Sequence, residues 1–236
     1  MLKDLLPRAA RIGAWSAMIL AAWVHLTTAS AQTPGNSAGT WEIDTAASEV
    51  HWRIYKAGAF ARFGHNHVVA IAEPSGTIEV AANIADSRFE MRFAVGELSI
   101  DDAELRGRYG EDFESEPSDE DVDGTRDNML TEQVLNGDVY PEIFVVGTQL
   151  SGVGEDQSIE LSIEMLGRTV SLTVPVNVSF GAQTLRAQAN FRIQHEDLGM
   201  EPFSVMMGAL QVAPEIDFTV DIRAVRRVGE APAQVL

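Results

Sequence analysis

The sequence predicts an all-β protein built as a single antiparallel barrel, and two observations support this prediction. Apolar and polar residues alternate along most of the chain after Trp41, which places every second side chain on one face of a strand. Strand also follows strand without a helical repeat between them, which favours antiparallel connections over a parallel α/β sheet. Closing such a sheet into a barrel would remove its exposed edges.

The length, net charge and cysteine content of the chain exclude several classes of partner and site. The 236 residues, 45% of them hydrophobic, are enough to bury the core of one domain. The formal charge of −18, from 35 acids against 17 bases, would repel nucleic-acid phosphates and excludes nucleic acid as a partner. The absence of cysteine excludes disulfides, thiolate metal sites, iron–sulfur clusters and thioether-linked haem.

Residues 1–31 have the pattern of a secretory signal peptide. Three basic residues precede an apolar run from Ile12 to Leu26, and Ala29-Ser30-Ala31 then provides an A-x-A cleavage site before Gln32. The run is shorter than the ~20 residues that span a bilayer. We therefore expect a cleaved, soluble periplasmic protein with no stable membrane insertion after signal cleavage, and a flexible lead-in over residues 32–40.

The barrel domain is expected over residues 41–227, followed by a C-terminal tail at 228–236. Counting a stretch near His65, about nine strands emerge from the period-2 pattern. The other apolar rows are Val50-Trp52-Ile54, Ile78-Val80-Ala82-Ile84, Phe89-Met91-Phe93-Val95, Phe144-Val146, Ile159-Leu161-Ile163-Met165, Val170-Leu172-Val174-Val176-Val178, Leu185-Ala187-Ala189-Phe191-Ile193 and Ile216-Phe218-Val220-Ile222.

Two further elements interrupt the strands. Residues 101–127 hold twelve acids and three bases, and this charge density predicts a solvated loop insertion. One short helix is expected from Asn128 to Leu135, with Asn136-Gly137 as its stop.

Motifs for catalysis or calcium binding are weak. No G-x-S-x-G occurs and the inward rows carry essentially no acid, so we do not expect an enzyme. Residues 119–124 match the front of a calcium loop, but position twelve is Leu130 where a bidentate Glu is needed. An EF-hand is therefore excluded, and only a weak calcium site is left open.

The order of several short motifs resembles the YceI-like family across residues 41–225. The motifs are Trp41-Glu42-Ile43-Asp44, Ser48-Glu49-Val50-His51-Trp52, Gly96-Glu97-Leu98-Ser99-Ile100, Val139-Tyr140-Pro141-Glu142-Ile143-Phe144, Met165-Leu166-Gly167-Arg168-Thr169, Phe191-Arg192-Ile193, Leu198-Gly199-Met200, Val212 and Glu215-Ile216-Asp217-Phe218. The resemblance implies a lipocalin-like barrel in the periplasm that binds and carries an isoprenoid or other long-chain amphiphile. Gly64-His65-Asn66-His67 is similar to a GHNH-bearing subset, and the acidic insertion departs from the family pattern.

The inward rows would line the ligand cavity, because they are long and nearly free of charge. The candidate ligand-binding residues are Trp52, Ile54, Phe63, His65, His67, Phe89, Met91, Phe93, Leu172, Phe191, His195 and Phe218. A barrel filled by its own side chains has the same pattern, and a purely structural module is also left open. The sequence likewise leaves open a homodimer.

Histidines offer a second functional class. On a regular strand His65 and His67 share the apolar face, His195 shares a face with Ile193, and His51 points away. His65, His67 and His195 are thus candidates to bind a lipid head group, a divalent metal or haem iron. The alternative function is a histidine-based metal or haem protein of the periplasm, and a turn in which the rings satisfy local backbone is left open beside it.

Overall fold

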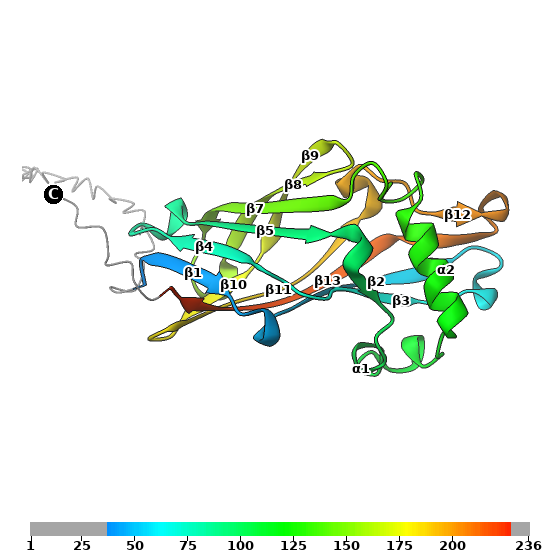
Figure 1. Cartoon of the computed structure of the whole chain (residues 1–236), viewed down its shortest axis with the longest axis horizontal. Helices are drawn as coiled ribbons and strands as arrows, with labels where there is room; N and C mark the ends of the chain where they lie inside the picture. Colours follow the sequence, from blue (N-terminus) through cyan, green and yellow to red (C-terminus); the bar gives the residue numbers. More distant parts are fainter. Residues whose placement is uncertain (1–36, 228–236) are drawn as a thin grey trace, which may run out of the picture.

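The structure is a computed structural model that describes residues 37–227, and its thirteen strands form one antiparallel sheet (Figure 1). The strands are β1 (Gly39–Ile43), β2 (Glu49–Ala57), β3 (His67–Ile71), β4 (Gly76–Val80), β5 (Arg88–Ala94), β6 (Leu98–Ile100), β7 (Glu142–Ser151), β8 (Ser158–Met165), β9 (Arg168–Pro175), β10 (Asn177–Phe180), β11 (Thr184–Gln194), β12 (Ser204–Val205) and β13 (Leu210–Arg226). The α-helices are α1 (Ala103–Arg106) and α2 (Asp119–Leu130). Single 3₁₀ turns are η1 (Thr45–Ala47), η2 (Ala61–Phe63), η3 (Ile84–Asp86), η4 (Val95–Glu97), η5 (Gly110–Phe113), η6 (Gly154–Asp156), η7 (His195–Leu198) and η8 (Met206–Gly208).

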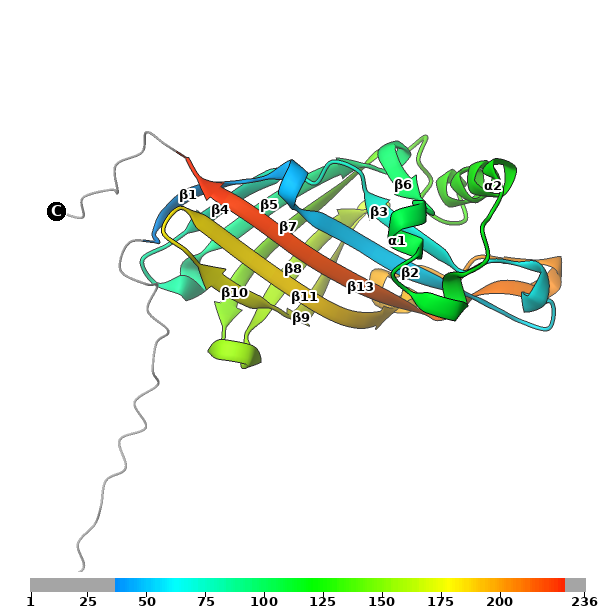
Figure 2. The ribbon, with the colours of Figure 1, turned by 90° about the horizontal axis from the view of Figure 1, so that it is seen from below.

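The long strand β13 organises the sheet. One edge of β13 pairs with β11, and the other edge pairs first with β2 and then with β1 (Figure 2). From β1 the ladder continues through β4, β5, β7 and β8 to β9, while β3 and β6 extend it from β2. The predicted all-β antiparallel class is therefore confirmed.

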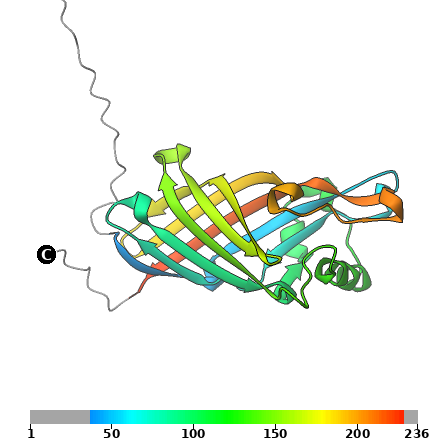
Figure 3. The ribbon, with the colours of Figure 1, turned by 90° about the horizontal axis from the view of Figure 1, so that it is seen from above.

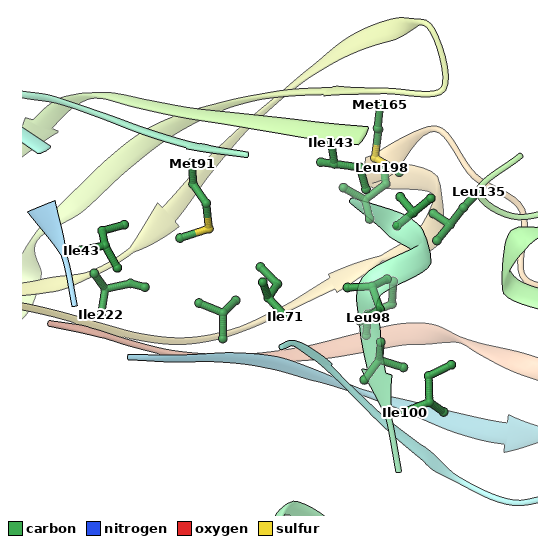
Figure 4. Close-up of a cluster of buried hydrophobic side chains, with 14 residues drawn as sticks. Ile43, Ile71, Met91, Leu98, Ile100, Leu135, Ile143, Met165, Leu198 and Ile222 are labelled. Atoms are coloured by element: carbon green, nitrogen blue, oxygen red, sulfur yellow. The ribbon is translucent and has the colours of Figure 1, made fainter. Parts of the chain in front are cut away.

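The sheet rolls around an interior and brings β9 back to the side of β11 (Figure 3). Among residues 37–227 no hydrogen-bonded ladder joins β9 to β11, so the barrel is not closed by hydrogen bonds. The inward rows line this interior. In Figure 4, Ile43, Met91 and Ile222 lie together in one part of the core, and Met165 and Leu198 in another.

The number and limits of the strands differ from the prediction. The apolar row from Val170 to Val178 is divided between β9 and β10, because Pro175 has no amide hydrogen to continue the ladder. Instead the Val176 amide donates to the Gln157 carbonyl at 3.0 Å. The shortest strands, β6 and β12, carry too few residues to show a period in the sequence.

The predicted helix from Asn128 to Leu135 is wrong in position. Helix α2 begins earlier, after Ser118, whose side chain and that of Asp121 form a reciprocal capping box. The helix ends at Leu130, and Thr131 is its extended C-cap residue. The acidic composition of the segment concealed this start signal.

The acidic insertion is also not a solvated loop. It contains α1, η5 and most of α2, and it buries Arg106 and Phe113 at 5% and 4% exposure. Leu105 and Phe113 pack with Val68 and Ala70 in a small core on the outer side of β3. The segment therefore covers part of the sheet.

Several predicted segments lie at the ends of the chain. The signal peptide at 1–31, residues 32–36 of the lead-in and the tail at 228–236 lie outside the described residues. The last two residues of the predicted lead-in, 39 and 40, belong to β1, so that prediction extended too far. Within residues 37–227, no helix combines the length and apolar character needed to cross a membrane.

Candidate ligand cavity

The inward rows surround a cavity of about 210 Å³ inside the barrel. Its walls are aliphatic and aromatic, apart from Ser87 and Arg88. The candidate residues that line it are Trp52, Phe89, Met91, Phe93, Leu172, Phe191 and Phe218. The period-2 pattern positions them, because each occupies an inward position on its strand.

Three aromatic rings form one wall of this inner cavity. The sheet register places Phe218 of β13 opposite Trp52 on one side and opposite Phe191 on the other. The Phe191 and Phe218 rings stack with centroids 5.1 Å apart, and the Trp52 ring stacks on Phe218 at 5.7 Å. This row presents flat, polarisable surface to an apolar occupant.

A second cavity of about 230 Å³ lies at the end of the barrel near α2. It follows the first along β2, because Trp52 lines the inner cavity and Ile54, two positions on and therefore on the same face, lines the outer one. Together the two reach the size of typical ligand sites, about 300–1,000 Å³. The outer cavity is more polar, and its lining residues are Ile54, Tyr55, Lys56, Gly64, His65, His67, Thr125, Asn128, Met129, Val134, His195, Glu201, Phe203, Val205, Leu210, Gln211 and Val212.

Asp101 fixes the orientation of His67 in the outer cavity. The Asp101 side chain is fully buried, and its Oδ2 lies 2.6 Å from His67 Nδ1. Its Oδ1 accepts from the Val68 amide at 2.9 Å and from the Arg106 guanidinium. An ionised carboxylate only accepts, so Nδ1 carries the hydrogen and Nε2 of a neutral His67 is left as an acceptor for the occupant.

The charge state of Asp101 follows from the same contacts. Burial would raise the pKa of Asp101. Hydrogen bonds from His67 and the Val68 amide, together with the charge of Arg106, outweigh burial and lower that pKa below its ordinary value. The carboxylate is therefore ionised at neutral pH.

The other two candidate histidines are also held through Nδ1. His195 Nδ1 donates to the Pro214 carbonyl at 2.8 Å, which leaves Nε2 as its acceptor when neutral. His65 Nδ1 lies 3.3 Å from Ser115 Oγ, and its Nε2 lies 4.0 Å from Asp121. The outer cavity thus brings together three imidazoles, of which that of His195 is buried and those of His65 and His67 are partly buried.

The same geometry contradicts the metal site predicted from His65, His67 and His195. The rings of His65 and His67 have centroids 6.3 Å apart, but His195 follows β11, and β2 and β13 lie between β11 and β3. At about 4.8 Å per strand, that separation exceeds what one ion can bridge. In the described part of the chain no three His, Cys, Asp or Glu residues are grouped to hold a metal ion.

The weak calcium site left open at residues 119–124 is not supported either. These residues form the first turns of α2. Asp121 is used as the capping residue of that helix, so its carboxylate accepts from Ser118. A calcium loop needs a turning backbone that a helix does not provide.

Phe63 was predicted to face the cavity, and this is wrong. It ends the 3₁₀ turn η2 beyond β2, and 66% of its surface is exposed. The alternation that predicted its direction ran through His65, His67 and Val69, but β3 begins only at His67, so the pattern does not extend back to Phe63.

His51 points away from the interior but is not solvated. Only 1% of its surface is exposed, because Tyr109 of the insertion covers it and contacts its Nε2. Its Nδ1 lies 3.1 Å from Glu49 Oε1. Burial lowers the pKa of His51, which favours a neutral ring beneath the insertion.

Sequence reasoning missed much of the outer cavity. Thr125, Asn128 and Met129 of α2 line it, and so does Phe203 before β12. The capping pattern from Ser118 to Asp121 was a signal that could have placed α2, and hence its residues, correctly. No comparable signal marked Phe203.

Comparison with known families matches residues 41–224 to the YceI-like domain. Among solved structures, the chain is similar to BcnA of Burkholderia cenocepacia, with 14% identity and a TM-score of 0.57 over 78% of this chain and 99% of that chain. It is also similar to the YCEI protein of Campylobacter jejuni, with 9% identity and a TM-score of 0.48 over 67% of this chain and 84% of that chain. The likeness to BcnA supports the fold. Comparison with curated proteins gave no match.

Proposed function

Because the chain belongs to the YceI-like family, we propose that it binds and carries a long-chain amphiphile such as an isoprenoid. The observation that supports this most strongly is the arrangement of the two cavities along β2: the inner one is almost wholly apolar, and the outer one adds polar side chains to an apolar lining. The tail would occupy the inner cavity against the row of aromatic rings. The head group would occupy the outer cavity beside His65, His67 and His195.

Burial of the tail favours such a complex. Each carbon that the cavities bury releases about 0.8 kcal/mol, against a total association cost of about 4–15 kcal/mol. The free energy of binding therefore depends on how much of the tail the cavities hold. The inner cavity offers hydrocarbon rather than reactive groups, which is why we propose a carrier and not an enzyme.

The proposal includes a location. We propose that residues 1–31 direct export to the periplasm and are removed before Gln32, on the basis of the short apolar run and the Ala29-Ser30-Ala31 site. N-terminal sequencing of protein from its native cells tests this. A chain that begins at Gln32 in the periplasmic fraction is the expected result, and an intact Met1 in the membrane fraction would contradict it.

Filling the inner cavity tests the binding itself. Ala187 of β11 faces this cavity and Asn190 of the same strand is exposed. Ala187→Phe should reduce the affinity for a long-chain isoprenol by at least about tenfold, since the new ring occupies the space of the tail. Asn190→Phe, the control on the same strand, should bind as the wild type does. Equal affinity in all three proteins would exclude the inner cavity as the site.

A further inference from the structure

Five large apolar side chains gather at the tips of two hairpins. Phe60 and Phe63 lie in the β2–β3 connection, with 37% and 66% of their surfaces exposed. Val205 ends β12, and Met206 and Met207 follow it in the β12–β13 connection, with 38%, 63% and 105% of their surfaces exposed. Single exposed apolar residues are ordinary, but several of them on two joined hairpins indicate an interaction surface. We call these five residues the hairpin tip.

The two hairpins are joined into one projection. The Phe60 amide donates to the Ala209 carbonyl at 2.8 Å. A Cβ atom on Gly58 would meet that same carbonyl at 2.6 Å, so this close approach requires glycine. The Phe60 and Phe63 rings are 6.1 Å apart. Figures 1 and 3 show both hairpins extending together beyond α2 at one end of the molecule.

The backbone holds the methionines outward. Met206 and Met207 both adopt positive φ, 53° and 56°, which is the left-handed region that L residues rarely enter. Such conformations cost free energy and persist at functional positions more often than elsewhere. Their consequence here is that Met207 has no part in the core and is presented entirely to solvent.

The two segments that carry the hairpin tip contain no acidic residue. Among 35 acids in the protein, none lies within residues 56–72 or 202–214. The first of these segments carries Lys56 and Arg62, and the Arg62 guanidinium sits 4.3 Å from the centre of the Phe63 ring. Apolar side chains flanked by basic ones suit the boundary between acyl chains and phosphates, where they insert and pair respectively.

The hairpin tip also adjoins the mouth of the outer cavity. Val205 belongs to both, and Gly64 and Leu210, which follow the two groups of tip residues, line the cavity as well. We propose that the hairpin tip docks on the surface of a phospholipid bilayer, so that the amphiphile passes between the membrane and the cavity. This inference rests on the proposed function, because a lipid carrier must exchange its cargo with a bilayer.

Vesicle binding tests the proposal. The probe is a vesicle of zwitterionic phosphatidylcholine, because the five acids of α2 beside the tip would be repelled by anionic lipid. The wild type should float with vesicles, and the double variant Phe63→Ser, Met207→Ser should bind at least about tenfold more weakly. The control is Val153→Ser, which changes a residue 63% exposed in the β7–β8 connection. All three proteins begin at Gln32, the start proposed above, so the apolar run of residues 12–26 does not contribute to vesicle binding.

A second measurement places the contact within the bilayer. Met207→Trp should show fluorescence quenching by brominated acyl chains, and Val153→Trp should not. Equal vesicle binding by wild type and double variant, or no difference in quenching, would overturn the docking proposal. A change of oligomeric state in the double variant without a change in vesicle binding would also overturn it, since the tip would then contact a second copy. If the protein retains its amphiphile but does not bind vesicles, the docking proposal is wrong and the proposed function is unaffected.

Discussion

Asp101 is a buried charge on which both the outer cavity and the insertion depend. It accepts hydrogen bonds from His67 and from the Val68 amide, and it pairs with Arg106, whose guanidinium also reaches the carbonyls of Asn66 and Ser115. These contacts tie β3 to the insertion. Loss of one partner from a buried pair leaves the other charge uncompensated.

We expect Asp101→Asn to lower the free energy of unfolding by about 3–5 kcal/mol at neutral pH. Urea unfolding followed by circular dichroism measures this. Asp123→Asn, which changes an exposed carboxylate on α2, is the control and should shift stability by less than about 0.5 kcal/mol. Similar values for both variants would show that the Asp101 network does not stabilise the fold.

The contacts of Asp217 determine part of the change in the free energy of unfolding at acid pH. Arg192 makes two hydrogen bonds to its carboxylate, at 2.5 and 2.8 Å, and the Tyr55 hydroxyl donates to it at 2.7 Å. The Arg192 contacts are the main reason that the pKa of Asp217 falls from 3.8 to about 2. Burial and the bond to Asp217 raise the pKa of Tyr55 to about 12. Because the folded pKa is depressed, the stabilisation is present above pH 3.8 and is lost as pH falls toward about 2.

We expect Asp217→Asn to cost about 1–2 kcal/mol at neutral pH, a modest value because Arg192 is largely exposed. The difference between wild type and variant should shrink as pH falls between about 4 and 2. Thermal unfolding across this pH range measures it. A difference that stays constant through the acid range would refute the assigned role of Asp217.

At the scale of elements, the alternating strands could be predicted from the sequence and the insertion could not. The inward rows of strands such as β5 and β8 can be recognised in the sequence by their period of two. Burial of one face of the strand requires an apolar residue at every second position. In the insertion, the high content of acidic residues predicted a solvated loop, although a few of its residues are buried. Arg106 and Phe113 are buried by contacts distant in the sequence, and no local pattern reports such contacts.

Of the candidate site, likewise, one part could be predicted from the sequence and the other could not. The inner cavity is a direct product of alternation, so its lining could be listed in advance. The outer cavity depends on where α2 and the β12–β13 hairpin lie relative to the sheet, which is a matter of tertiary packing. Two predictions were wrong: that Phe63 faces the cavity, and that the three histidines hold one metal ion. Both assumed regular strand geometry in residues that lie outside the strands.

The insertion should behave as a packed element. Phe113→Ala removes a ring that is 4% exposed and packs at 5.9 Å from the Tyr55 ring and 5.6 Å from the Tyr109 ring. We expect a loss of about 3–5 kcal/mol in unfolding free energy. Differential scanning calorimetry would show it as a lowered midpoint. An unchanged midpoint would mean that the insertion contributes nothing to the stability of the sheet.

At the scale of the whole molecule, the strand β13 connects the core, the inner cavity and the hairpin tip. β13 carries Phe218 in the aromatic wall, pairs along most of its length with β11, and leads from the β12–β13 hairpin at the end of the molecule. The rolled sheet therefore places the apolar inner cavity, the more polar outer cavity and the exposed hairpin tip one after another along the molecule. A carrier that exchanges cargo at a bilayer needs these features in this order.

Native mass spectrometry of protein purified from its own cells tests the central claim most directly. We expect a mass excess that corresponds to one long-chain amphiphile per chain, that organic solvent extracts, and that Ala187→Phe reduces. Protein without an extractable amphiphile, or with a stoichiometric metal or haem lost when His65, His67 and His195 are replaced, would contradict it.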